Sequence, residues 1–258
     1  MTILSGIMRI TIKFAYDGKK YSGYARQPNL KTVEGELLDT LVKHNFIRDA
    51  KESVFRSASR TDKGVSALCN VVAFNANHFR KDILQKLSNE FQDIIVYGIA
   101  NVDPNFNPRF AKQRQYRYCL KFDDFDIDKI IATSNVFTGT HNFSNFARIE
   151  SFKNPVRTIN NIMFSTKDDF LLIDFYAQTF LWHQIRRIIS ALIKVRSGKL
   201  EKELIIDALD NPDNKVDFGL APAEPLILKD IVYNFDLEYN ESQFKKVKQL
   251  EKKIISSL

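Results

Sequence analysis

An arginine and a carboxylate stand two residues apart in the segment Ser-Arg-Thr-Asp-Lys-Gly-Val-Ser-Ala at residues 59–67. The segment contains a glycine and separates two apolar, strand-like runs, which predicts a tight turn. In a basic chain, a carboxylate held on a turn beside Arg60 is suited to nucleophilic attack on a polyanion with an electrophilic centre. An ordinary turn is the alternative, since Asp bonds its own backbone and Gly accepts positive φ. Asp62 is the first candidate for chemistry.

A second candidate lies in the run Lys-Gln-Arg-Gln-Tyr-Arg-Tyr at residues 112–118. A strand period places Tyr116 and Tyr118 on one face of the strand and Arg117 on the other. Because basic residues flank both rings, Tyr116 could stack on a base while the cations hold phosphate. A half-buried strand with a solvated edge explains the same pattern.

A third candidate, Arg186, follows from helical geometry. At about 100° per residue, the apolar side chains of a helix predicted over 179–196 fill one broad arc. Arg186 falls at the margin of this arc, next to Ile193. A partly buried guanidinium needs an anion, and either Asp62 or Asp174 could supply it.

Cysteine and histidine are used sparingly. The two cysteines, Cys69 and Cys119, form no Cys-x-x-Cys pair, and the four histidines lack metal-ligand spacing. We therefore predict no metal site, and a reducing cytoplasm is the simplest setting. The first eight residues lack the basic region of a leader, and no run approaches membrane-spanning length, so we expect neither secretion nor membrane insertion.

Composition indicates a folded protein with an anionic partner. The chain has 258 residues, of which 44% are hydrophobic and 27% charged, so one large domain or two ordinary ones are expected. A formal charge of +7 favours a polyanion, because phosphate neutralisation releases counterions. Some of the 21 Phe and nine Tyr could serve as stacking platforms for bases, although most are expected in the core.

The spacing of apolar residues predicts the order βαββαβ in the first half, which is that of a ferredoxin-like unit. In the first strand, apolar residues alternate with Arg9, Thr11 and Lys13, which predicts a single buried face. Thr32 is suited to cap the first helix. Asp62 then lies between the second and third strands. The expected strands cover residues 9–16, 53–58, 69–76 and 94–102, and the helices cover 33–42 and 83–91.

The second half repeats this order without repeating the residues. The expected strands cover residues 113–122, 156–165, 169–177 and 226–235, and the helices cover 126–133, 179–196 and 201–209, before a charged helical tail after Glu238. We therefore expect an α+β fold with two ferredoxin-like halves, residues 1–105 and 106–258. No Gly- or Pro-rich linker separates them, so we expect the halves to pack around a central, mostly antiparallel sheet with a basic cleft between them.

Six motifs, in the same order along the chain, resemble those of the tRNA pseudouridine synthase A family, and they extend over nearly the whole sequence. They read Phe-Ala-Tyr-Asp-Gly at 14–18 with Tyr-Ser-Gly-Tyr-Ala-Arg-Gln-Pro at 21–28, Arg-Thr-Asp-Lys-Gly-Val at 60–65, Arg-Gln-Tyr-Arg-Tyr at 114–118, Gly-Thr-His-Asn-Phe-Ser at 139–144, Phe-Leu-Trp-His-Gln-Ile-Arg at 180–186 and Gly-Leu-Ala-Pro-Ala-Glu-Pro at 219–225.

The resemblance implies an isomerase that converts uridine to pseudouridine in the anticodon stem-loop of tRNA, typically at positions 38 to 40, without cofactor or metal. By motif, Asp62 is the nucleophile, Tyr116 packs against the target base, and Arg186 pairs with Asp62 to keep it ionised. Arg60 assists extrusion of the base, which a stem otherwise keeps out of reach. Whether Asp62 adds to the base or to the sugar stays open. The resemblance also implies a homodimer.

Four positions depart from the family's pattern. Glycine is common where this chain has Ser59, Ser190 and Pro225, and histidine is common where it has Ser66. None of the four removes a proposed catalytic group, so they bear on local backbone shape and on the choice among neighbouring uridines.

Two other functions compete with this prediction. A non-catalytic RNA-binding protein of ferredoxin-like fold would use the same basic surface and aromatic residues without needing Asp62. A metal-dependent nuclease would need clustered carboxylates to hold Mg²⁺, whereas the sequence offers one well-placed acid. The sequence does not identify the main phosphate-binding residues, for which Lys19, Lys20, Lys112 and Arg187 are candidates.

Overall fold

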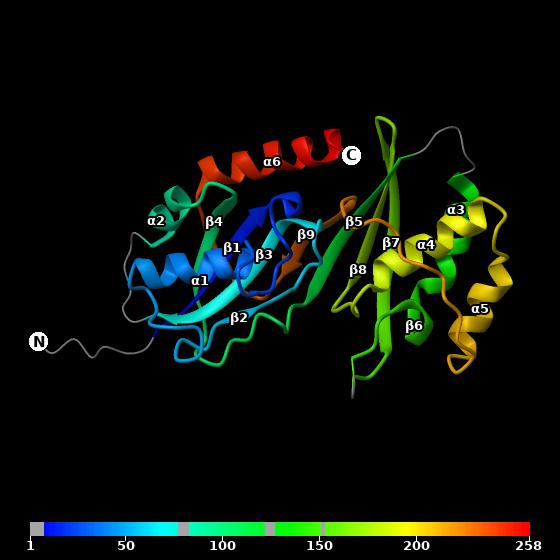
Figure 1. The fold of residues 1–258 in the computed structure, drawn as a ribbon, viewed down its shortest axis with the longest axis horizontal. Coiled ribbons are helices and arrows are strands. Elements are labelled where there is room, and N and C mark those ends of the chain that lie inside the picture. The colour runs from blue at the N-terminus through cyan, green and yellow to red at the C-terminus, as the bar shows by residue number, and fades with distance from the viewer. Residues whose placement is uncertain (1–7, 77–82, 122–126, 151–152) are drawn as a thin grey trace, which may run out of the picture. The chain divides into compact units, whose positions relative to one another are not determined.

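Two compact units make up the chain in a computed structural model, shown in Figure 1. The structure describes residues 8–76, 83–121, 127–150 and 153–258. By their contacts, residues 1–112 and 227–258 form the first unit, and residues 113–226 form the second. The predicted strand end at 122, the predicted helix start at 126 and the first seven residues lie outside the described residues. Helices and mostly antiparallel strands occur in both units, which confirms the α+β class.

The first unit is built on a sheet in which, among its described strands, only the pairing of β3 with β9 is parallel. The strand order is β10-β4-β1-β3-β9, and the short strand β2 also pairs with β3. The elements are β1 (Met8–Tyr16), the 3₁₀ helix η1 (Gly18–Lys20), α1 (Val33–Lys43), β2 (Arg56–Ser57), β3 (Ser66–Ala76), α2 (Ile83–Glu90), β4 (Ile94–Asn101), β9 (Leu226–Val232), β10 (Glu238–Tyr239) and α6 (Glu241–Ser256).

The predicted cap of α1 is confirmed. The Thr32 hydroxyl accepts a hydrogen bond from the Gly35 amide at 3.2 Å, which satisfies one of the unpaired donors at the start of the helix. Val33, Leu37 and Leu41 are fully buried along one side of α1. This helix therefore begins where its sequence predicts, and its apolar stripe joins the core.

The expectation of a single buried face on β1 is wrong, because both faces are covered. Arg9, Thr11 and Lys13 are less than 10% exposed, and each has a partner. The Arg9 Nε donates to the Phe106 carbonyl oxygen at 2.6 Å, and the Thr11 hydroxyl donates to the Val72 carbonyl oxygen at 2.9 Å. Hydrogen bonding removes most of the cost of burying these polar groups, so an alternating pattern fits a central strand here.

Lys13 is buried and lies in a small polar cluster with the partly exposed Asp230. Its ammonium donates to a carboxylate oxygen of Asp230 at 2.9 Å, joining β1 to β9. Cys69 of β3 lies beside this pair, and burial raises the pKa of its thiol to about 12. Both cysteines, Cys69 and Cys119, stand outside any disulfide and are only 2% exposed.

The second unit carries a fully antiparallel sheet in the order β5-β8-β7-β6. Its elements are β5 (Gln113–Lys121), α3 (Ile127–Ser134), η2 (Asn135–Phe137), β6 (Gly139–Asn142), η3 (Ser144–Phe146), β7 (Val156–Lys167), β8 (Phe170–Ala177), α4 (Gln184–Arg196) and α5 (Lys202–Asp210). Strand β6 and the two 3₁₀ helices have no counterpart in the predicted pattern, because these elements are only three or four residues long.

Helix α4 begins at Gln184 rather than at the predicted residue 179. His183 has a φ of 66°, in the left-handed region, so the helix does not extend back through it. Before it, the Leu181 amide donates to the Gln184 side chain at 2.8 Å, and the Trp182 carbonyl accepts from the Arg148 amide at 2.8 Å. Phe180 and Leu181, at the start of the predicted arc, therefore lie before the helix and outside it.

Within the described ranges, none of the helices combines the length and the apolar character needed to span a bilayer.

The pair of Lys13 and Asp230 predicts an asymmetric response to mutation. Asp230→Asn leaves an ammonium buried without its counter-charge, and we expect it to lower the free energy of unfolding by roughly 1–3 kcal/mol. Lys13→Met removes the charge and keeps the volume, and the Asp230 side chain, 44% exposed, can bind water instead. Urea unfolding of both variants measures the difference. A larger loss for Lys13→Met than for Asp230→Asn would contradict this account.

Candidate active site

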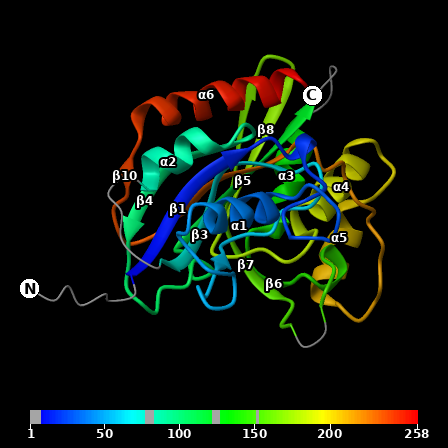
Figure 2. The ribbon, with the colours of Figure 1, turned by 60° about the vertical axis from the view of Figure 1, so that its left-hand side comes forward.

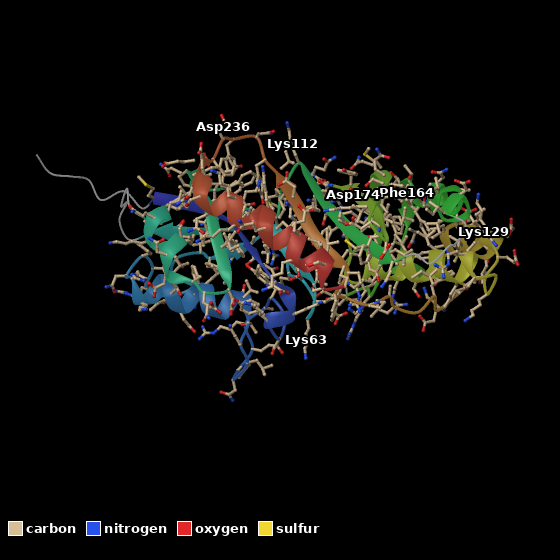
Figure 3. All side chains as sticks on the ribbon, turned by 90° about the horizontal axis from the view of Figure 1, so that it is seen from above. Lys63, Lys112, Lys129, Phe164, Asp174 and Asp236 are labelled. Atoms are coloured by element: carbon tan, nitrogen blue, oxygen red, sulfur yellow. The ribbon has the colours of Figure 1, made fainter. Side chains whose placement is uncertain are left out.

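The Asp62 turn connects β2 to β3 in the first unit. The Val65 amide donates to the Asp62 carbonyl at 3.1 Å, which closes the turn, and Gly64 has a φ of 88° that favours glycine. Asp62 is half-buried, whereas Arg60 and Lys63 on either side are exposed. Figure 3 labels Lys63 at the rim of this unit. The turn thus holds a carboxylate between two solvent-facing cations.

The residue before Asp62 is held at several points. The Thr61 hydroxyl shares a hydrogen bond with the Tyr16 hydroxyl at 2.8 Å, and the Thr61 carbonyl accepts from the Tyr24 amide at 3.2 Å. Upstream, the Asn70 side chain donates to the Ser59 carbonyl at 3.0 Å. Since Thr61 is itself buried, these contacts fix the backbone that presents Asp62.

Gly18 packs against the far side of the same turn. A Cβ atom on Gly18 would lie 2.3 Å from the Val65 carbonyl oxygen and 2.8 Å from the Gly64 carbonyl carbon, so only glycine fits without movement. The Gly18 amide donates to the Ser66 hydroxyl at 3.0 Å. Ser66, which departs from the family's pattern, therefore ties the loop after β1 to the Asp62 turn. No pattern in the sequence predicts this hydrogen bond.

A tyrosine cluster supports the turn without offering a base. Tyr16 packs against Tyr21 and Tyr24, with ring centroids 6.1 and 6.3 Å apart. The Tyr24 hydroxyl donates to Ser57 at 2.7 Å, and Ser57 donates to Glu34 at 3.2 Å. Burial raises the pKa of Tyr24 well above its ordinary value, so the phenol stays protonated and acts as a hydrogen-bond donor.

Tyr116 lies on β5 in the second unit, half-buried and paired across the sheet with Phe175. The ring of Phe180 meets it edge-to-face, with centroids 5.4 Å apart and planes at 86°. This contact fixes the orientation of the Tyr116 ring. The predicted placement of Tyr116 on a strand is confirmed, and its role toward a base stays a prediction.

Arg186 lies on α4 and is half-buried, as its position at the margin of the apolar arc predicts. Its Nε donates to the Ala221 carbonyl at 2.8 Å. Asp174, one of its two proposed partners, accepts from Arg117 through both carboxylate oxygens, at 2.9 and 2.7 Å. Figure 3 labels Asp174 on the second unit. The Arg117–Asp174 pair thus uses the alternative acid, and pairing of Arg186 with Asp62 stays a prediction.

The four proposed site residues divide between the units. Asp62 and Arg60 share one turn of the first unit, and Tyr116 and Arg186 belong to the second. Sequence reasoning missed one exposed aromatic residue of the second unit. Trp182 is 42% exposed, and the Arg148 guanidinium lies 4.3 Å from its ring centroid. The helix predicted over 179–196 includes Trp182, whereas in the structure Trp182 lies before α4 and forms an isolated bridge with Arg148.

Metal ligands do not cluster in the part of the chain that the structure describes: no group of three or more His, Cys, Asp or Glu side chains there could hold an ion.

Comparison with known proteins identifies the family. A family model described as tRNA pseudouridine synthase matches residues 134–234. The tRNA pseudouridine synthase A of Thermococcus sibiricus is 42% identical over 249 residues, which cover 94% of this chain and 91% of the relative. That of Pyrococcus furiosus is 38% identical over 244 residues, covering 93% and 89%. That of Methanothermobacter thermautotrophicus is 38% identical over 243 residues, covering 92% and 86%.

Likeness to solved structures is weak by comparison. One match is a chain in a Cbf5-Nop10-Gar1 complex, at 14% identity. The match covers 71% of this protein and 44% of that chain, and its TM-score of 0.37 is too low to indicate a shared fold. The sequence relatives match nearly from end to end at well above 30% identity. The chain therefore belongs to the tRNA pseudouridine synthase A family of isomerases.

Proposed function

We propose that this chain isomerises uridine to pseudouridine in the anticodon stem-loop of tRNA, typically at positions 38 to 40, with Asp62 as the nucleophile. The observation that carries the proposal is the fixed turn: Asp62 directly follows Thr61, whose hydroxyl and carbonyl are both bound by buried tyrosines. A nucleophile held in one position loses little free energy to orientation when the substrate arrives. Family membership supports the same reaction.

The isomerisation is balanced without an external reactant. The Asp62 carboxylate adds to the nucleoside, and the glycosidic bond between N1 of the base and C1′ of the sugar breaks. The uracil turns, a bond forms between its C5 and C1′, and the carboxylate is released. The proton on C5 is lost and N1 becomes protonated. Addition of the carboxylate to the base and addition to the sugar both fit this order of steps, since either uses an ionised carboxylate.

The other proposed residues act on the extruded uridine. Arg60 is exposed beside Asp62, where its guanidinium could fill the space that the base vacates and contact phosphates. Tyr116, oriented by Phe180, packs against the target base. Arg186 pairs with Asp62 and keeps it ionised, with its Nε oriented by the Ala221 carbonyl.

The proposal includes an organisation into two ferredoxin-like halves, residues 1–105 and 106–258, with a basic cleft between them. The sheet order β4-β1-β3, with β2 on β3, supports this organisation in the first half. In the second half, α3 follows β5 and α4 follows β8, and the strand order β5-β8-β7 is compatible with the same unit. From the family resemblance we also propose a cytoplasmic homodimer that needs no cofactor or metal.

Asp62→Asn tests the nucleophile. The amide keeps the shape of the side chain but cannot attack, so we expect pseudouridine formation to fall by at least about a thousandfold. Affinity for tRNA should change little, because one surface charge among many is removed. Mapping pseudouridine along unmodified tRNA transcripts measures conversion and identifies the target positions, and a binding titration measures affinity.

Asp168→Asn is the matched control for that experiment. Asp168 lies in the turn between β7 and β8 with a φ of 49°, a conformation that Asn also tolerates, and the same charge is removed. Full activity is expected of this variant. Conversion by Asp62→Asn at the rate of the control would remove Asp62 from the mechanism, and tRNA binding without conversion by the unmodified protein would favour a non-catalytic RNA-binding protein.

Gly18→Ala tests whether the shape of the turn matters for activity. The added methyl group would lie 2.3 Å from the Val65 carbonyl oxygen, so the turn that carries Asp62 must move. A displacement near 1 Å is expected to lower turnover by about a hundredfold while tRNA affinity is retained. Gly198→Ala is the control away from the turn, because its Cβ would meet no atom within 4 Å. Its φ of 69° makes alanine locally strained, so the thermal midpoint of both variants is measured beside turnover. Equal turnover by both variants would show that the position of the turn is not critical.

A further inference from the structure

Helix α6 closes the chain and docks on the first unit by a narrow apolar face. The Asn240 side chain accepts from the Gln243 amide and caps its start. Val247, Ile254 and Ile255 are buried, and α6 packs along β4 and β3. Gln243 also donates to the Ser88 carbonyl of α2 at 3.0 Å. Figure 2 shows α6 running alongside α2 and β4.

The opposite side of α6 is strongly basic. Five lysines, all exposed, occur in its sixteen residues, against two acids. We call them the α6 lysines: Lys245, Lys246, Lys248, Lys252 and Lys253. Residues seven apart point in nearly the same direction on a helix, so Lys245 and Lys252 form one row and Lys246 and Lys253 form a second. Along each row the lysines are about 10.5 Å apart.

The α6 lysines differ from several other lysines of this unit, which are neutralised by nearby acids. Elsewhere in the unit, Lys20 and Lys31 both pair with Asp93, and Lys43 pairs with Glu90. On α6 itself, Glu251 accepts from Lys229 of β9 at 2.5 Å. Among the residues that the structure describes, no carboxylate lies within salt-bridge distance of the α6 lysines. Their positive charge is therefore available to an external anion.

The C-terminal end of α6 is joined to the loop that supports the Asp62 turn. The Lys19 ammonium donates to the Ser257 carbonyl and hydroxyl oxygens, both at 3.0 Å. The neighbouring Gly18 packs on Gly64 and Val65 of the turn. From this end the helix extends about 24 Å, all within the first unit. An RNA held at the turn would thus have α6 within reach of its backbone.

We propose that the α6 lysines form a binding surface for the phosphate backbone of tRNA, outside the nucleotide that enters the active site. The inference rests on tRNA being the substrate and adds a surface that positions it. Two rows of ammonium groups match a polyanion better than a single anionic ligand, because each phosphate contact releases counterions. Such contacts carry no base sequence information, so the surface acts on affinity and orientation alone.

The test replaces four lysines together. Lys245→Gln, Lys246→Gln, Lys252→Gln and Lys253→Gln keep good helix formers on exposed positions, so the thermal midpoint should be unchanged. For full-length tRNA, the slope of log K against log salt should become shallower by about 0.7–0.9 for each phosphate that the variant no longer binds. At physiological salt we expect KM to rise about tenfold or more, whereas kcat at saturating tRNA stays constant, because Asp62 is untouched.

A variant with the same charge change elsewhere is the control. Lys121→Gln, Lys167→Gln, Lys199→Gln and Lys215→Gln alter four exposed lysines of the second unit. A smaller change in slope and KM than in the α6 variant supports the proposal. Equal effects would assign the result to net charge and overturn it, as would an unchanged slope in the α6 variant. Loss of binding only to vesicles of acidic phospholipid would overturn it in favour of a membrane surface.

These outcomes separate the inference from the proposed function. If the unmodified protein forms no pseudouridine, the proposed function fails whatever the α6 variant does. If the unmodified protein is active and the α6 variant binds and converts tRNA equally well, only the assignment of α6 fails, and its lysines are then an ordinary solvated face.

Discussion

The geometry of the candidate active site depends on one close approach of backbone to backbone, that of Gly18 to the carbonyl of Val65. No side chain larger than hydrogen fits between the loop after β1 and the Asp62 turn. Once the two loops meet at this distance, the Gly18 amide reaches Ser66 and the Tyr16 hydroxyl reaches Thr61. The carboxylate is therefore positioned by the packing of β1 and β3, whose residues are almost entirely buried.

Around this turn, charge and hydrogen bonding are divided between different residues. The phenols of Tyr21 and Tyr24 are kept neutral, since burial, and for Tyr21 also the nearby Glu36, raises their pKa. Tyr21 donates to Glu36, and Ser57 donates to Glu34, so these two acids have partners within the fold. Asp62 stands between the exposed cations Arg60 and Lys63. Neutral donors and their paired acids thus build the support, and the exposed cations beside Asp62 are open to an anionic partner.

Sequence reasoning locates most elements because their apolar periods are long enough to read. Helix α2 is expected over 83–91 and covers Ile83–Glu90, and β8 is expected over 169–177 and covers Phe170–Ala177. Elements of a few residues, such as β6, carry too few periods to be recognised. The predicted start of α4 lies five residues early because periodicity does not reveal the left-handed conformation of His183.

For the site, the sequence identifies the turn but not what holds it. The motif around Asp62 predicts a turn, and the structure has one. The supports come from Tyr16, Tyr24 and Asn70, which are distant in sequence and depend on strand pairing that no local pattern encodes. Burial of both faces of β1 escapes prediction for a related reason, because the partners of Arg9 and Lys13 lie about a hundred and two hundred residues away.

The burial of both cysteines has a practical consequence for measuring motion in this enzyme. Cys69 is enclosed beside Lys13 with the pKa of its thiol at about 12, and Cys119 is equally inaccessible. A thiol in such surroundings reacts slowly, because the thiolate is the reactive species. A single cysteine introduced on an exposed residue would therefore accept a fluorophore or spin label selectively, so distances between the two units could be followed without first removing the native cysteines.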